Sequence, residues 1–410
     1  MNEDTSSEVA SHAYSHPAPN YDPTLINVGK GRPGGELLRR YWQPFALAGE
    51  ATNVPRKIRL LGEDLILFRP GNGVAGLLYP RCMHRGTNLF FGRVEDDGIR
   101  CCYHGWKYDV VGRCLDQPAE PGGGRQRARV RQPWYPVVER YGAIWAYMGP
   151  PDKQPVFPRF SIFENMTADE EVLSYYLTRN GELAPWPEDF CFFALYENAL
   201  DTHHVPILHT MISGPQFSGN SSAGRQSVNF PKVQWKSTEN GVVAIAERKL
   251  PDGSRHISYS EALMPNLISL APFFTKNGPG NELFWVVPWD DDNHTVLMMK
   301  RQKKGTPAPD NRKIFTFGPD GKYWSELTPE EHQRYPGDYE AEASMGKHVM
   351  HSEEHLVTSD FGVALLRRRF REQAKVVADG GDPVGVSFDP NDIFKINSAA
   401  VTLAPEGVSA

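Results

Sequence analysis

RCMHRGTNLFFGRVEDDGIRCCYHGWKYD, residues 81–109, is the stretch that decides the fold of this chain, because it contains two Cys/His pairs with metal-ligand spacing. Cys82 and His84 form a Cys-x-His pair, and after sixteen intervening residues Cys101 and His104 form a Cys-x-x-His pair. Thiolates and imidazoles together bind transition metals. The stretch therefore predicts a metal centre held between two loops.

The order of these four side chains distinguishes two kinds of metal centre. A Cys2His2 zinc finger supplies both cysteines before both histidines, whereas here each cysteine precedes its own histidine. In a Rieske [2Fe–2S] cluster two cysteines hold one iron and two histidines hold the other, so the order favours that cluster. Cys102 is an alternative to Cys101, but it would require Cys-x-His spacing in both loops. Because such a cluster only passes single electrons on, substrate chemistry needs a second site.

Length, charge and cysteine content narrow the class of protein. The 410 residues suffice for two or three domains, and a net charge of -6 offers no overall basic character for nucleic acid. Five cysteines, an odd number without a framework spacing, predict a reducing cytoplasm and no disulfide. Since no apolar run reaches the roughly 18 residues of a membrane span, no membrane partner is expected either.

Strand and helix signals divide the chain into three parts. Residues 1–34 are expected to be a mobile tail, residues 35–155 an all-β domain that carries the cluster, and residues 156–410 a second domain. In the all-β part the predicted elements are a helix over 35–42, a hairpin formed by 57–68 and 73–79, and a strand over 137–147. In the second domain strands are predicted near Val172, Val233, Gly241, His256 and Glu282.

The C-terminal third contains a long amphipathic helix that begins near Ser359 and Asp360. Its predicted buried stripe consists of Val363, Leu366, Phe370, Ala374 and Val377, and its outward side of Arg367, Arg368 and Arg371. The tract 305–337 is expected to run over the surface, with its ends covering a pocket. Surface positions are also expected for Arg248, Arg255 and His256.

A second metal-binding pattern lies in YENALDTHHVPILHT, residues 196–210. Asp201, His204 and His209 fall at i, i+3 and i+8, and two imidazoles with one carboxylate form the facial triad of non-haem Fe(II) oxygenases. On a regular helix the two histidines would be about 140° apart. Pro206 lies between them and disrupts a helix, so a local distortion that re-aims His209 is expected. His203 competes with His204 for the ligand role.

These residues resemble the catalytic α-subunits of Rieske non-haem iron oxygenases, the aromatic-ring-hydroxylating oxygenases. CMHRGTNL and CCYHGWKYD match the cluster loops of that family, and ENALDTHHVPILH matches its iron motif. GDYEAEASMG, residues 337–346, followed by EEHLVTSD, is similar to the branch typified by phthalate dioxygenase and aryl O-demethylases. The resemblance implies Asp338 as the third iron ligand beside His204 and His209. The competing carboxylates are Glu340, Glu342 and Asp360.

The resemblance also implies a fold, further roles and partners. The fold is α+β, with an all-β Rieske domain followed by a helix-grip catalytic domain. Asp201 would bridge His204 to the neighbouring subunit's His104 within a homotrimer, and Asn198 would lie close to the iron. A flavin or iron–sulfur reductase, with or without a ferredoxin, would supply electrons.

The function expected from this resemblance is that of an oxygenase component. It would use O2 to hydroxylate or O-demethylate an aromatic substrate, expected to be an aromatic acid. The alternative from another class is a Rieske electron-transfer protein without oxygenase activity.

Overall fold

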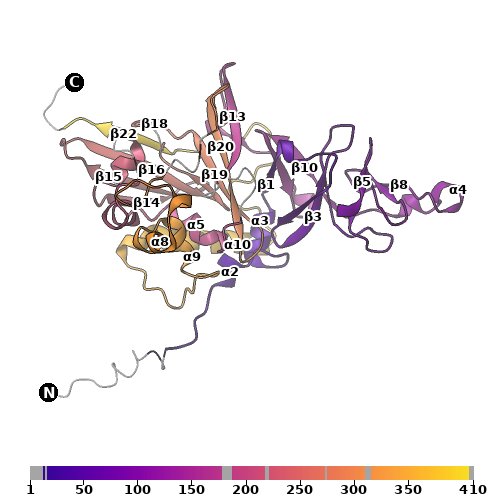
Figure 1. The fold of residues 1–410 in the computed structure, drawn as a ribbon, viewed down its shortest axis with the longest axis horizontal. Helices are drawn as coiled ribbons and strands as arrows, with labels where there is room; N and C mark the ends of the chain where they lie inside the picture. The colour runs from indigo at the N-terminus through magenta and orange to yellow at the C-terminus, as the bar shows by residue number, and fades with distance from the viewer. Residues whose placement is uncertain are drawn as a thin grey trace.

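The computed structural model describes residues 13, 16–177, 187–217, 221–272, 275–308, 310 and 315–405. Its two parts lie side by side along the long axis of the molecule (Figure 1), a smaller N-terminal β domain at one end and a larger sheet domain with helices at the other. The predicted α+β organisation is therefore confirmed. Among the described residues, none of the helices combines the length and hydrophobicity that a membrane span requires.

The N-terminal domain consists of three small antiparallel sheets. Their strand orders are β1-β11-β10, β2-β3-β4-β9 and β5-β6-β7-β8. The strands are β1 (Trp42–Leu47), β2 (Arg56–Leu60), β3 (Glu63–Phe68), β4 (Gly76–Leu78), β5 (Arg93–Val94), β6 (Ile99–Arg100), β7 (Lys107–Tyr108), β8 (Cys114–Asp116), β9 (Trp134–Tyr135), β10 (Val137–Arg140) and β11 (Ala143–Tyr147).

Two predicted single strands of this domain are in fact hairpins. The stretch 57–68 turns at Leu61-Gly62, and the stretch 137–147 turns at Tyr141-Gly142. In both turns the two loop residues have positive φ, 48° and 79° in the first and 56° and 75° in the second. Two-residue loops of this kind match the twist of the flanking strands. These turns could not be recognised from the sequence because Leu and Tyr rarely adopt positive φ.

A nine-stranded sheet forms the centre of the second domain. Its main path is β13-β20-β19-β17-β16-β15-β14, with β22 beside β16 and β18 beside β22. The strands are β13 (Glu170–Leu177), β14 (Lys232–Ser237), β15 (Gly241–Lys249), β16 (Arg255–Leu263), β17 (Leu267–Ser269), β18 (Gly278–Pro279), β19 (Glu282–Pro288), β20 (His294–Lys303) and β22 (Ala399–Leu403). The five predicted strands are all present. β20 was missed although it pairs with both β13 and β19.

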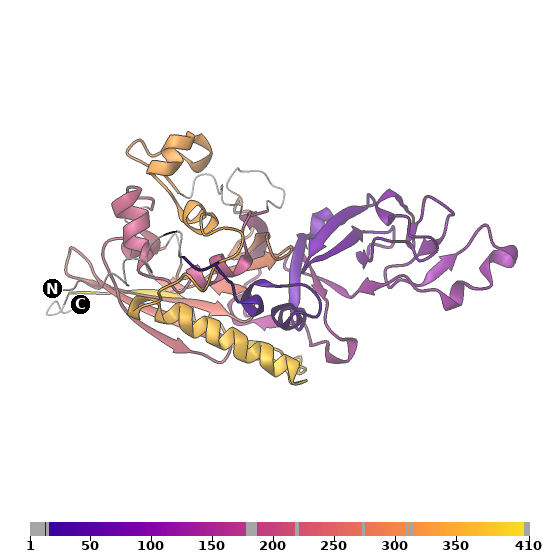
Figure 2. The same cartoon turned by 90° about the horizontal axis from the view of Figure 1, so that it is seen from below.

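The long C-terminal helix, α10 (Phe361–Ala378), packs across this sheet (Figure 2) and begins at the predicted cap Asp360. Val363, Leu366, Phe370 and Ala374 of its predicted stripe are buried. The prediction that Arg367 points outward is wrong, because this side chain is 4 % exposed and faces α5 (Phe192–Asn198) through an ion pair with Glu197. Arg248 and His256, expected at the surface, are also buried.

The N-terminal tail is shorter than predicted. α2 (Pro23–Ile26) contributes Leu25 and Ile26 to the main core and packs with α10, so residues before 35 already belong to the packed fold. The helix predicted over 35–42 is α3 (Pro33–Arg39). Pro44 lies within β1, beside a shift in register that accommodates its missing N–H. The division between domains near residue 155 stays a prediction.

Candidate metal centres and active-site cavity

The two cluster loops have the same backbone structure. In each loop the N–H of the cysteine donates to the carbonyl five residues later, and the glycine four residues after the cysteine donates back to the cysteine carbonyl. The residues are Cys82, Gly86 and Thr87 in one loop and Cys101, Gly105 and Trp106 in the other. Both glycines have positive φ, 79° and 72°. This repeated turn presents one cysteine and one histidine from each loop, and only glycine adopts it without strain.

The side chains of these loops are arranged as a [2Fe–2S] cluster requires. Cys82 and Cys101 are 3 % and 4 % exposed, and the ring centroids of His84 and His104 are 4.5 Å apart. Burial raises the pKa of the Cys82 thiol, and the neighbouring Cys101 adds to the shift. A cationic centre would relieve that penalty, since bound thiols are deprotonated. Cys102 is exposed, which disfavours it as the alternative to Cys101.

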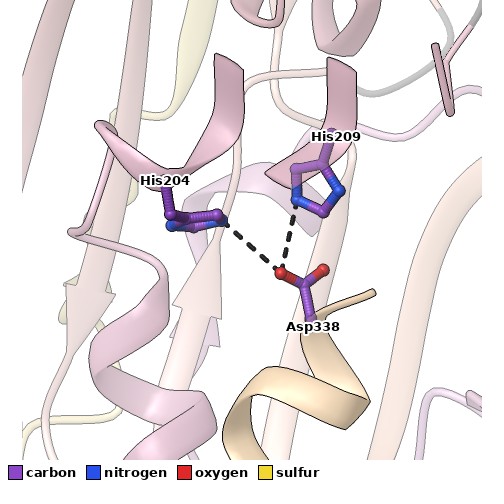
Figure 3. Close-up of side chains that lie close together, drawn as sticks. All are labelled: His204, His209 and Asp338. Atoms are coloured by element: carbon purple, nitrogen blue, oxygen red, sulfur yellow. Dashed lines mark ion pairs between the residues drawn. The ribbon is translucent and has the colours of Figure 1, made fainter. Parts of the chain in front are cut away.

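The second centre brings together His204, His209 and Asp338 (Figure 3), although Asp338 is distant in sequence. Asp338 Oδ1 lies 3.5 Å from His204 Nε2 and 3.3 Å from His209 Nε2. One ligand atom from each residue lies within 4.8 Å of the others. Two imidazole nitrogens and a carboxylate oxygen that converge in this way fit a single Fe(II) ion with other positions left open.

The helix that carries the two histidines is distorted as predicted. α6 (His204–Pro206) continues directly into a π-helical segment, Ile207–Ile212, which contains His209. A π-helix hydrogen bonds from i to i+5, so a five-residue step returns closer to the same face than in an α-helix. His209 is buried and its ring centroid lies 5.4 Å from that of His204. The distortion thus lets both imidazoles approach Asp338.

Each histidine has a different polar residue behind it. His204 Nδ1 lies 3.5 Å from the carboxylate of Asp201, which also accepts the backbone N–H groups of His203 and His204. Burial opposes ionisation of Asp201, but these hydrogen bonds outweigh it and lower its pKa. His209 Nδ1 lies 2.6 Å from Gln216 Oε1. Gln216 was missed from the sequence, because only the turn after the π-helix brings it back to His209.

The Gln216 amide fixes which nitrogen of His209 faces the centre. Its NH2 group lies 3.4 Å from the Pro336 carbonyl, so its oxygen must face His209. With a metal ion bound, His209 would carry its proton on Nδ1 and direct the Nε2 lone pair at the ion that it shares with Asp338. Ser213 donates to the same Pro336 carbonyl at 2.5 Å. The π-helix is therefore tied to the segment that leads into α9 (Asp338–Ala343).

The other candidates from the sequence lie around the centre or away from it. Asn198 Nδ2 is 3.5 Å from Asp338 Oδ1, so this asparagine does contact the candidate ligand. His203 points elsewhere, with its ring 5.9 Å from that of Trp235. The Glu340 carboxylate accepts from Gly337 N and Trp324 Nε1. Asp360 lies at the start of α10.

A cavity of about 190 Å³ adjoins the three side chains. His204, His209, Asp338, Asn198 and Asp201 form part of its wall. The rest is mainly apolar and includes Leu177, Leu195, Ile268, Leu270, Phe284, Val286, Val296, Phe315 and Phe317. Phe315 and Phe317 come from the tract predicted to run over the surface and cover a pocket. A cavity of this composition accepts an apolar substrate next to the metal-binding atoms.

A buried ion-pair network lies behind the helix that carries Asn198. Arg367 binds Glu197 through Nη2 at 2.6 Å and Glu354 through Nη1 at 2.5 Å. Burial alone would lower the pKa of Arg367, but the hydrogen bonds that it donates to these two carboxylates raise the pKa above its usual range. The network therefore fixes α5 to α10.

Comparisons with known proteins agree with this geometry. Residues 41–136 match the Rieske [2Fe-2S] domain family. The phenoxybenzoate dioxygenase subunit alpha of Ectopseudomonas oleovorans is 45 % identical over 390 residues, which are 93 % of this chain and 92 % of the relative. The tert-butanol monooxygenase / tert-amyl alcohol desaturase oxygenase subunit of Aquincola tertiaricarbonis is 36 % identical and covers 91 % of this chain and 81 % of that protein. The crystal structure of dicamba monooxygenase bound to dicamba has the same fold, with a TM-score of 0.58, 18 % identity, and coverage of 83 % of this chain and 99 % of that one.

The chain is therefore a Rieske-type oxygenase subunit. It belongs to the Rieske non-haem iron oxygenases as a catalytic α-subunit, and proteins of this family carry a [2Fe–2S] cluster and a mononuclear iron. The relatives are oxygenase subunits, so an electron-transfer protein without oxygenase activity is not favoured. When bound, the mononuclear iron supplies the activation of O2.

Proposed function

We propose that the chain oxygenates an aromatic ether or aromatic acid, by ring hydroxylation or by oxidative cleavage of the ether. The observation that carries this proposal is the apolar, phenylalanine-containing cavity beside His204, His209 and Asp338. A planar ring fits between aliphatic and aromatic side chains and buries most of its surface there. The name of the 45 % identical relative points to a phenoxybenzoate as substrate of that protein, which supports an aryl ether here.

Separate sets of residues would hold the two metal centres and shape the cavity. Cys82, His84, Cys101 and His104 would hold the [2Fe–2S] cluster, and His204, His209 and Asp338 would hold the iron. Asn198 would hold Asp338 in place through its amide. The apolar walls exclude water, so that a reactive centre meets the substrate and not solvent.

Asp201 has a role between the two centres in this proposal. Its carboxylate lies against His204 Nδ1 and is 35 % exposed on the side chain, so it is accessible to a second molecule. We place it between His204 and the neighbouring subunit's His104 in a homotrimer. Electrons would come from a flavin or iron–sulfur reductase, with or without a ferredoxin. The five free cysteines support a cytoplasmic location and a role in aromatic catabolism would fit such a substrate.

A substrate panel tests the proposal. The enzyme, a reductase and NADH are given phenoxybenzoates, methoxybenzoates, the same rings without a carboxylate, and tert-butanol, while O2 uptake, formaldehyde and products are measured. We expect oxygenated product from an aryl ether or aromatic acid. Formaldehyde indicates O-demethylation, and a phenol or dihydrodiol without formaldehyde indicates ring attack.

The His204→Ala variant is the control, because it retains the cluster loops but lacks one candidate iron ligand. Product formation by this variant in a folded protein would contradict the assigned site. Turnover of tert-butanol with no turnover of any aromatic compound would overturn the proposed substrate class.

A further inference from the structure

The segment RQRARVR, residues 125–131, carries four arginines within seven residues and has no role in either metal centre. It is here called the arginine arm. It follows the short helix α4 (Pro121–Gly124) and contains the 3-10 turn Arg127–Arg129. Figure 1 shows α4 at the tip of the N-terminal domain, at the end of the molecule opposite the catalytic sheet. All four arginines, Arg125, Arg127, Arg129 and Arg131, are exposed.

The arm is anchored to the domain by its backbone and by one apolar side chain. Val130 packs against the core cluster that contains the two cysteines of the metal centre. Arg131 pairs with Arg113 in an isolated β-bridge and donates from Nε to the Val111 carbonyl at 3.0 Å. The C-terminal end of the arm is therefore fixed to the domain, and the arm has a defined position on its surface.

None of the four arginines forms an ion pair within the described residues. Four other cations of this domain do: Arg93 and Arg100 bind Glu95, Lys107 binds Asp97, and Arg113 binds Asp109. The arm is therefore a run of cations with no neutralising carboxylate among the described residues, and its charge is directed to solvent or to a partner. Four like charges within seven residues repel one another, and a carboxylate-bearing partner would relieve that repulsion.

The arm lies beside the cluster loops. Pro118, just before α4, is so close to Gly105 that a Cβ there would lie 2.7 Å from the proline Cγ. Gln132, the residue that follows the arm, accepts the backbone N–H of Met83 in the first cluster loop at 3.0 Å. A protein bound to the arm would thus have its own redox group brought to the end of the molecule that holds the cluster.

The charge of this end differs from that of the rest of the chain. Residues 81–131 contain ten Lys or Arg and six Asp or Glu, a net charge of +4, whereas the whole chain carries -6 and the remaining residues therefore -10. A concentrated positive patch on an acidic protein steers negatively charged partners to one place and raises association rates.

We propose that the arginine arm is the docking site for an acidic electron-donor protein, an iron–sulfur or flavin domain with a carboxylate-rich surface around its redox group. In the bound complex the reduced donor loses one electron and the oxidised cluster gains it, with no bond made or broken. This inference rests on the proposed function, because it takes the cluster to be reduced by a partner protein.

A second copy of this chain fits the arm less well than an electron donor does. Permanent subunit contacts have apolar centres, whereas brief electron-transfer contacts are small and polar. The arm offers guanidinium groups with Gln126 and Ala128 between them. Exposed apolar side chains lie instead on the cluster loops themselves, where Met83 is 48 % and Tyr103 58 % exposed. The loops and the arm thus suit different partners.

The test measures reduction of the cluster, without substrate. Full-length enzyme and the variant Arg125→Gln/Arg127→Gln/Arg129→Gln are mixed with a reduced, acidic plant-type [2Fe–2S] ferredoxin in a stopped-flow instrument. The loss of cluster absorbance gives the second-order rate constant. We expect that constant to fall about 10-fold to 100-fold at low salt, the range that electrostatic steering supplies. The wild-type rate should also decline with added salt, and the variant rate much less.

Matched controls make the result specific. Arg32→Gln/Arg334→Gln/Arg368→Gln removes three exposed charges outside the arm and should leave the rate nearly unchanged. Reduced methyl viologen, a small cation that needs no docking site and is repelled by the arm, should reduce the variant at least as fast as the wild type. A charge-reversed arm with three glutamates should pass electrons faster to cytochrome c, a basic acceptor.

Several outcomes would overturn the proposal. Equal losses in the arm and control variants would show a general charge effect, and slower reduction by methyl viologen would show damage to the cluster. Loss of the oligomer on sedimentation would assign the arm to a subunit contact. A wild-type rate independent of salt would exclude electrostatic docking without any variant. Because no substrate is present, a wrong substrate class in the proposed function would leave these rates unaffected.

Discussion

The two metal-binding regions of this protein are built in opposite ways. The four candidate cluster ligands fall within the 23 residues from Cys82 to His104, on two loops whose backbones repeat the same turn. The three candidate iron ligands come from a π-distorted helix and from Asp338, 129 residues beyond His209. The first site is encoded by spacing and local turns, whereas the second exists only when distant segments pack together.

This difference determines what each region depends on. The cluster loops need glycine at two positive-φ positions and two buried cysteines. The iron site needs the Pro336 carbonyl to be held by Ser213 and Gln216. Changes far from the metal should therefore disturb the iron site more than the cluster.

The largest effect is expected for a change within the local region. Cys101→Ser should abolish the [2Fe–2S] absorbance and all reductase-supported turnover, because serine does not replace a buried thiolate ligand. Cys102→Ser should retain both, since Cys102 is exposed. Visible absorption spectra and iron and sulfide analysis of the two variants decide the matter. A cluster that survives in Cys101→Ser and is lost in Cys102→Ser would reverse the ligand assignment.

The next prediction separates the two regions. His209→Ala should remove the mononuclear iron and product formation while the cluster spectrum stays as in the wild type, because no cluster ligand changes. His203→Ala, one residue away from His204 but facing Trp235, should keep the iron. Iron counted by metal analysis against sulfide measures this directly. Loss of the cluster in His209→Ala would mean that the two sites fold as one unit.

The amino-acid sequence predicts the local region well for a physical reason. Ligand spacing, glycines and turns are short-range properties, so the cluster loops and the distortion after Pro206 follow from the sequence alone. Asp338 was reached only through a family resemblance, because no short-range signal distinguishes it from Glu340 or Glu342. Gln216 was not found at all.

The wrong prediction for Arg367 on α10 and the missed strand β20 have the same origin, because both depend on contacts between distant segments. Arg367 was placed outward because its charge is a local property, whereas its burial depends on Glu197 and Glu354 from elsewhere in the chain. β20 was likewise missed, since its central place in the sheet follows from β13 and β19.

The third prediction measures that long-range network. Arg367→Met should lower the free energy of unfolding by about 3–5 kcal/mol, because it leaves the buried Glu197 carboxylate and the half-buried Glu354 carboxylate without their cation. Arg368→Met, at the exposed neighbouring position, should change it by less than about 0.5 kcal/mol. Denaturant unfolding followed by fluorescence gives both values. Equal stability of the two variants would show that the ion-pair network contributes nothing to the free energy of unfolding. It would then not be what holds α5 against α10.

The smallest effect is expected behind His209. Gln216→Leu removes the acceptor from His209 Nδ1 and the donor to Pro336, so the imidazole loses the group that fixes its tautomer. Partners of this kind are worth about 10-fold to 100-fold in metal affinity, and we expect Fe(II) affinity to fall by that factor in competition with a chelator. Gln216→Glu keeps an oxygen toward His209 and should recover most of it. Unchanged Fe(II) affinity in Gln216→Leu would show that packing alone orients the His209 ring. The iron site would then be no more dependent on long-range hydrogen bonds than the cluster loops are.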